Sequence, residues 1–102
     1  MTGSDYYVLE PCSSSNGMEI KLKNKKIALN LAESAFLELG TVAANTGVVL
    51  LTKIDEYTVS VYASGRMMVK AKKKPKQKDI EKLAQKIIVA LEKYNSIIEG
   101  KE

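Results

Sequence analysis

Strand-like patterns occur first near the amino terminus, in the segments Tyr6 to Glu10 and Met18 to Lys23. In the second segment apolar and polar side chains alternate one by one, which is the period of a strand with one buried face and one face in water. The Ser/Asn/Gly-rich stretch between them, Pro11 to Gly17, is typical of a turn. We therefore expect two short strands separated by this turn.

Helical spacing appears in two later segments, where apolar residues recur every three or four positions. The first runs from Asn24, a residue type that favours the amino-terminal cap, to Leu39, just before Gly40. The second runs from about Pro75 to Ile98 and begins with a proline, which suits the first turn of a helix. The pattern therefore predicts helices over 24–39 and 75–98.

The region between the predicted helices is rich in β-branched residues and predicts three antiparallel strands. These are Gly47 to Ile54, Tyr57 to Ala63 and Arg66 to Lys72, joined by turns at Asp55-Glu56 and Ser64-Gly65. Because successive side chains of a strand point to opposite faces, parity sorts the residues of the last two strands. The set expected to face the core is Val59, Val61, Met67, Val69 and Ala71. The set expected on the other face is Thr58, Ser60, Tyr62, Met68 and Lys70.

The order of these elements is strand, strand, helix, three strands, helix, which predicts a small α+β protein. Only one face of each strand is apolar, so both helices are expected to pack on one face of an antiparallel sheet of about five strands. The length of 102 residues is that of one ordinary domain, and we expect residues 1–102 to form it.

The composition removes most catalytic chemistry. The chain has no His, and its single thiol, Cys12, cannot form an intramolecular disulfide or a Cys-based zinc site. The acidic pair Asp55-Glu56 lies in a predicted turn, where such residues are common because they are soluble. Neither a phosphate-binding loop nor a dinucleotide-binding fingerprint is present. We therefore expect a protein that is not an enzyme and that carries no cofactor or metal.

The chain lacks the roughly 18 uninterrupted apolar residues of a membrane span. Its first residues, Met1 to Asp5, have neither the basic start nor the apolar run of a signal peptide. These features predict a cytoplasmic protein without a membrane partner.

Positive charge is concentrated in the second half of the chain. The net charge is +4, but residues 1 to 50 have a balance of −1 and residues 51 to 102 a balance of +5. The densest part is a run of six lysines without an acid: Lys70, Lys72, Lys73, Lys74, Lys76 and Lys78. Such a run is typical of a phosphate-binding patch, and equally of a solvated loop before a helix.

Three segments resemble parts of one repeat of the TATA-box-binding protein (TBP), in the same order and at similar separations. They are Leu22 to Leu29 (LKNKKIAL), Tyr62 to Val69 (YASGRMMV) and Leu83 to Lys86 (LAQK), and the resemblance covers most of residues 6 to 95. It implies a TBP-like fold, in which the α+β domain has a curved antiparallel sheet. The DNA-binding protein of that family has two repeats forming a saddle, whose concave sheet widens the minor groove and wedges Phe side chains between base steps. This chain has one repeat, and a homodimer joined edge to edge is one way to rebuild a ten-stranded saddle.

The resemblance also implies roles for single positions on the open sheet face. One wedge position of the family matches Tyr62. The other falls at or near Gly47, so that wedge is absent, and the basic position after the turn matches Arg66. Three further contact positions match Met68, Lys70 and Ser60. Because this face is more polar and less wedge-like than the family's, specific recognition of a TATA sequence is not expected.

Two functions from different classes remain open on these observations. The leading expectation is a nucleic-acid-binding module that reads shape and charge rather than base identity. Its expected contacts are Arg66, Lys70, Lys72, Lys73, Lys74 and Tyr62. The rival expectation is a protein-interaction or assembly module whose open sheet face docks a partner or a second copy through Ser60, Tyr62 and Met68.

Overall fold

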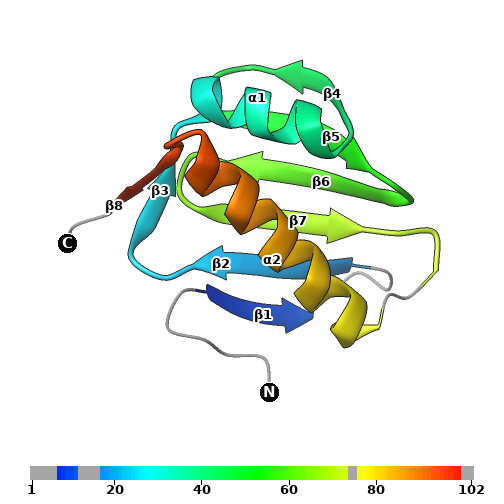
Figure 1. Cartoon of the computed structure of the whole chain (residues 1–102). Coiled ribbons are helices and arrows are strands. Elements are labelled where there is room, and N and C mark those ends of the chain that lie inside the picture. Colours follow the sequence, from blue (N-terminus) through cyan, green and yellow to red (C-terminus); the bar gives the residue numbers. More distant parts are fainter. Residues whose placement is uncertain (1–6, 12–16, 74–75, 100–102) are drawn as a thin grey trace.

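The main element of the fold is a six-stranded antiparallel sheet with the strand order β1-β2-β7-β6-β5-β4 (Figure 1). The structure is a computed structural model, and it describes residues 7–11, 17–73 and 76–99. The strands of this sheet are β1 (Tyr7–Pro11), β2 (Gly17–Leu22), β4 (Thr41–Asn45), β5 (Val49–Ile54), β6 (Tyr57–Tyr62) and β7 (Arg66–Lys70). A second, two-stranded sheet pairs β3 (Lys25–Ile27) with β8 (Ile97–Glu99). The helices are α1 (Leu29–Leu39) and α2 (Gln77–Lys93).

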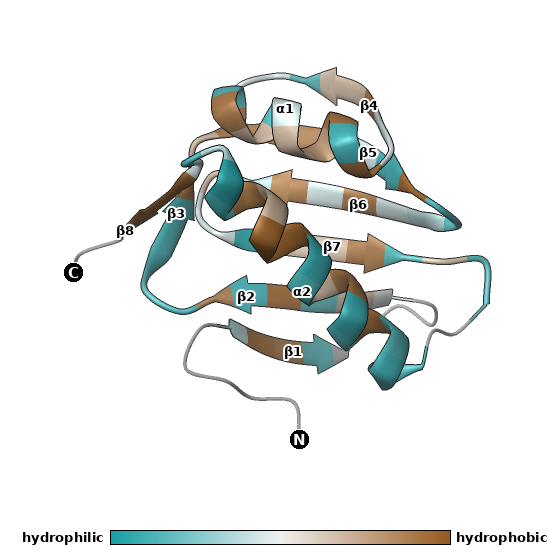
Figure 2. Cartoon of the chain, viewed as in Figure 1, coloured by the Kyte–Doolittle hydropathy of each residue, from teal (hydrophilic) through white to brown (hydrophobic). Residues whose placement is uncertain are grey.

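Both helices lie on one face of the six-stranded sheet, as Figure 1 shows. The residues predicted by parity to face the core, Val59, Val61, Met67 and Val69, are fully buried there. Along β2, the alternate residues Ile20 and Leu22 are also buried, as predicted. Figure 2 shows the resulting alternation of hydrophobic and hydrophilic positions along the central strands. The predicted α+β class, with both helices on one side of an antiparallel sheet, is therefore confirmed.

The predicted start of the first helix at Asn24 is wrong. Asn24 has a φ of +54° and lies in a turn, and the next three residues form strand β3. Tertiary backbone hydrogen bonds hold this segment extended, because the amide of Ile27 donates to the carbonyl of Ala63 and that of Ala28 to Ser96. The helix begins at Leu29, and Ala28 precedes it without a side-chain cap.

The predicted end of the second helix at Ile98 is also wrong, because α2 stops at Lys93. Asn95 adopts a φ of +56°, and its amide donates to the carbonyl of Glu92. The amide of Ser96 donates to the carbonyl of Leu91, which completes a Schellman motif with Asn in the left-handed position. The motif releases the chain into β8, where Ile98 is half exposed rather than docked. The predicted start at Pro75 lies outside the described residues.

The sheet has one strand more than the five expected. The added strand, β4, pairs with β5 at the edge of the sheet, and its register shifts between Val42 and Ala44. Gly40 makes the passage from α1 into β4 possible, because a Cβ there would come within 2.0 Å of the carbonyl oxygen of Lys53. The last strand of the meander ends at Lys70 rather than Lys72.

Within the described part of the chain, neither helix has the combined length and apolar character that crossing a bilayer requires.

Candidate functional site

The face of the sheet opposite the helices carries the side chains that alternate with the buried ones, and we call it the open face. Strand register aligns one residue from each strand in a row across it. From β1 to β4 this row is Glu10, Glu19, Met68, Ser60, Leu51 and Ala44. The row is acidic on the β1 and β2 side and apolar or small on the other side. The two sides therefore offer different chemistry to a ligand.

Arg66 lies on the acidic side of the open face and has partners within the chain. Its guanidinium forms an ion pair with Glu19, whose side chain is only 14% exposed, and it lies 5.6 Å from the centre of the Tyr62 ring. On the neighbouring strands, the Lys21 ammonium lies 3.2 Å from a carboxylate oxygen of Glu10. The cations of this side are thus matched by carboxylates, which reduces their attraction for a phosphate.

Lysines gather at the other end of β7. Lys70 is opposite Thr58 on β6, and Thr58 is opposite Lys53 on β5, so the two lysines flank one threonine on the open face. These three residues line a hollow of about 530 Å³ together with four residues from the adjoining segments: Asp55, Glu56, Ala71 and Lys72. Three ammonium groups therefore surround a hollow that also borders two carboxylates.

Two predicted nucleic-acid contacts remain, and only one of them lies in the part of the chain that the structure describes. Lys73 is exposed and continues the lysine run beyond the hollow. Lys74 lies outside the described residues, as does Cys12.

Lys53 was missed by the sequence analysis, since its position beside Thr58 depends on the pairing of β5 with β6. In β5, Leu50, Thr52 and Ile54 are buried. The alternation of side chains along this strand is therefore the signal that would have assigned Lys53 to the open face.

The structure brings together the residues of the predicted interaction face. Ser60 is directly opposite Met68, and Tyr62 follows two positions along the same strand, with all three side chains half-buried. Leu51 is directly opposite Ser60 on the other side and extends this patch. The members of both predicted sets that lie on β6 and β7 therefore share one face, with Lys70 at one end and the Tyr62-Arg66 contact at the other.

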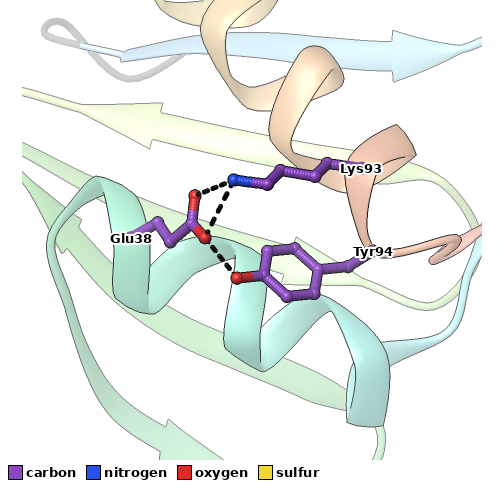
Figure 3. Close-up of polar contacts among 3 residues, drawn as sticks. All are labelled: Glu38, Lys93 and Tyr94. Atoms are coloured by element: carbon purple, nitrogen blue, oxygen red, sulfur yellow. Dashed lines mark hydrogen bonds and ion pairs between the residues drawn. The ribbon is translucent and has the colours of Figure 1, made fainter.

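A second feature, not anticipated from the sequence, joins the two helices (Figure 3). The Tyr94 hydroxyl donates a hydrogen bond to the Glu38 carboxylate, and the Lys93 ammonium lies 3.3 Å from each of its two oxygens. The hydrogen bond from Tyr94 and then the ammonium of Lys93 lower the pKa of Glu38, and the same hydrogen bond raises the pKa of Tyr94. The contact links α1 to the end of α2 beside a groove of about 560 Å³.

Within residues 7–11, 17–73 and 76–99, no three carboxylate, thiol or imidazole groups come together in a way that could hold a metal ion. Comparison of the chain with protein-family models, with curated proteins and with solved structures found no match. The function is therefore proposed from the residues of this chain.

Proposed function

We propose that this chain is a non-catalytic nucleic-acid-binding module that contacts the sugar-phosphate backbone at the lysine end of β7. The observation that carries this proposal is the position of Lys53, Lys70 and Lys72 around one hollow of the open face. Lysine ammonium groups bind phosphates as point charges, and such contacts fix a nucleic acid in place without reading its sequence. Lys73 extends the same cationic surface beyond the end of the sheet.

The arrangement of the sheet supports a relation to one TBP-like repeat. If the unpredicted edge strand β4 is counted and the predicted edge strand β1 is left out, the contiguous strands β2-β7-β6-β5-β4 number five, and two helices lie on one of their faces. A ten-stranded saddle made of two repeats has five strands in each. In this proposal the five strands form a curved half-saddle whose open face meets the nucleic acid.

In this proposal, Arg66 and Tyr62 have a different role from the phosphate-binding lysines. Because Arg66 is paired with Glu19, it supports the Tyr62 ring rather than supplying a free charge for a phosphate. Tyr62 and Met68 then present a small half-buried surface to a sugar or base beside the bound backbone. One aromatic ring is enough for stacking without base identity, which agrees with recognition by shape and charge.

The test compares two double variants with the same change in net charge. Lys70→Glu with Lys72→Glu alters the hollow, and Lys23→Glu with Lys26→Glu alters two exposed lysines of the β2–β3 region. Binding of a labelled DNA duplex and of a labelled single strand is measured by fluorescence anisotropy at two ionic strengths. We expect the first variant to lose at least about tenfold in affinity and to reduce the salt slope by roughly two, since two phosphate contacts are removed. The control is expected to lose less than about threefold.

Two results would contradict the proposal. One is the absence of binding to either nucleic acid by the unaltered protein even at low salt. The other is an equal loss in both double variants, which would indicate attraction to net charge rather than to the hollow.

The patch formed by half-buried Ser60 and Met68 and exposed Leu51 favours a second candidate, a protein-assembly module in which the open face docks another chain. A second copy of this chain would give the expected homodimer. This candidate predicts an association that tolerates salt and is weakened when Tyr62 and Met68 are both changed to Ala. Sedimentation equilibrium of the purified protein and of this variant distinguishes it from nucleic-acid binding.

A further inference from the structure

The side of α2 nearest α1 carries a row of lysines with a valine among them. Lys82, Lys86, Val89 and Lys93 are spaced by four, three and four residues, so they lie along one stripe of the helix. Val89 is 65% exposed, whereas the other large apolar residues of α2 are buried. A large exposed apolar residue within a cationic stripe is therefore the unusual feature of this helix.

This stripe borders the groove between the helices. The groove has a volume of about 560 Å³, and its apolar lining consists of Leu39 from α1 and Val89 and Ala90 from α2. The polar lining consists of Glu38, Lys82, Gln85, Lys86 and Lys93. The arrangement is a short apolar floor with charged side chains around it, which suits a segment that is itself amphipathic.

The charge of the groove is strongly one-sided. Three lysines line it against one carboxylate, Glu38, and that carboxylate is already engaged by Lys93 and Tyr94 (Figure 3). The Lys86 ammonium lies 3.9 Å from Asp55, but both side chains are more than half exposed, so this pair is weak and easily exchanged. Lys82 and Lys86 also border a second hollow with Asp55 and Asp79, while in the groove itself positive charge exceeds negative charge.

We propose that the groove between α1 and α2 binds an acidic amphipathic peptide segment of another protein. Carboxylates of the segment pair with Lys82 and Lys86, and one of its apolar side chains covers Val89. Complementary charge favours this occupant over a second copy, because a symmetric contact at this site would bring two lysine stripes together. It also favours a peptide over a nucleic acid, since phosphates gain nothing from the apolar floor.

This binding site is separate from the proposed nucleic-acid site. The helices lie on one side of the six-stranded sheet, and the open face is the other side (Figure 1). A peptide in the groove and a nucleic acid on the open face therefore do not compete for the same surface. The protein can hold both at once and join them.

The test begins with a random library of 16-residue peptides displayed on phage and selected on the full chain. We expect enriched sequences with several Asp or Glu and at least one large apolar residue. One enriched peptide is then labelled, and its affinity is measured by fluorescence anisotropy for the unaltered protein and for two matched double variants. The groove variant is Lys82→Glu with Val89→Ser, and the control is Lys23→Glu with Val48→Ser, which changes an exposed lysine and an exposed valine elsewhere.

We expect the groove variant to lose at least about tenfold in peptide affinity and the control to lose less than about twofold. Circular dichroism confirms that both variants are folded. The proposal is overturned if no acidic sequences are enriched, if both variants lose affinity equally, or if the control loses more than the groove variant. It is also overturned if sedimentation shows a dimer of this chain that the groove variant abolishes, because the occupant is then a second copy. Loss of DNA binding in the separate Lys70 and Lys72 variant does not bear on these outcomes, so the two proposals fail independently.

Discussion

The two faces of the six-stranded sheet differ most clearly at two neighbouring methionines. Met67 is fully buried among the residues beneath the helices, whereas Met68 is half-buried on the open face, opposite Glu19 and Ser60. The same residue type thus serves packing on one side of the sheet and lies partly at the surface on the other. The alternation of side chains along a strand therefore separates positions that stabilise the fold from positions that can contact a partner.

A second contrast lies within the open face itself. On the β1 and β2 side, Lys21 and Arg66 are paired with Glu10 and Glu19. Near the β5–β6 turn, three lysines border a hollow. Two cations matched by two carboxylates leave little field beyond them, whereas three lysines against the two carboxylates of the hollow leave an excess of positive charge there. Binding of a polyanion is therefore expected at one end of the face rather than across all of it.

The largest expected effect sharpens the contrast between the two faces. Met67→Ala removes a fully buried side chain and should lower the free energy of unfolding by about 2 to 5 kcal/mol. Met68→Ala should lower it by less than about 1 kcal/mol, because that side chain retains contact with solvent. Urea denaturation followed by circular dichroism measures both. Equal losses would mean that the open face is covered in solution and that the contrast is wrong.

A smaller effect is expected from Glu19→Gln, which tests the contrast within the open face. The substitution removes a negative charge and releases the Arg66 guanidinium from its ion pair. We expect nucleic-acid affinity at low salt to rise roughly three- to tenfold, which corresponds to about 1 kcal/mol for one exchanged pair. Glu81→Gln on α2 makes the same charge change away from this face and should alter the affinity by less than about twofold. An unchanged affinity for Glu19→Gln would place Arg66 outside the binding surface.

The smallest effect concerns the exposed contact between the helices. Tyr94→Phe removes the hydrogen bond that is the main cause of the lowered pKa of Glu38. The folded-state pKa of Glu38 should then rise toward its ordinary value, as followed by carbon NMR of the carboxyl group. A lowered carboxyl pKa stabilises the fold above the ordinary Glu range and loses that contribution as the pH falls through the folded-state pKa. Tyr94→Phe should therefore reduce the acid sensitivity of stability slightly. A Glu38 pKa that is the same in both proteins would exclude the hydrogen bond.

The sequence was sufficient where apolar residues follow a regular local period. The interior of α2 was predicted from Ile80, Leu83 and Ile87, and all three are buried. The faces of β6 and β7 were predicted from parity because a hairpin with a short turn fixes its own register. Helix α1 was less clear: Leu31, part of its apolar spacing, is 43% exposed, whereas Phe36 is fully buried. Its small buried residues, Ala32 and Ala35, give a weak periodic signal.

The remaining features depend on contacts between distant parts of the chain. Strand β3 exists because Lys25 to Ile27 pair with Ile97 to Glu99, and no local pattern contains that information. The ion pair of Arg66 with Glu19 likewise depends on the register of β2 against β7. The predicted cationic set therefore included residues of β7 but not the carboxylate of β2 that neutralises one of its members.

The pairing of β3 with β8 also bears on how the protein forms during synthesis. Strand β3, which precedes α1, pairs with β8, and the amide of Ala28 donates a hydrogen bond to the carbonyl of Ser96. Translation proceeds from the amino terminus, so this pairing forms only after β8 has left the ribosome. Until then the backbone groups of β3 and of Ala28 lack the partners that β8 and Ser96 supply.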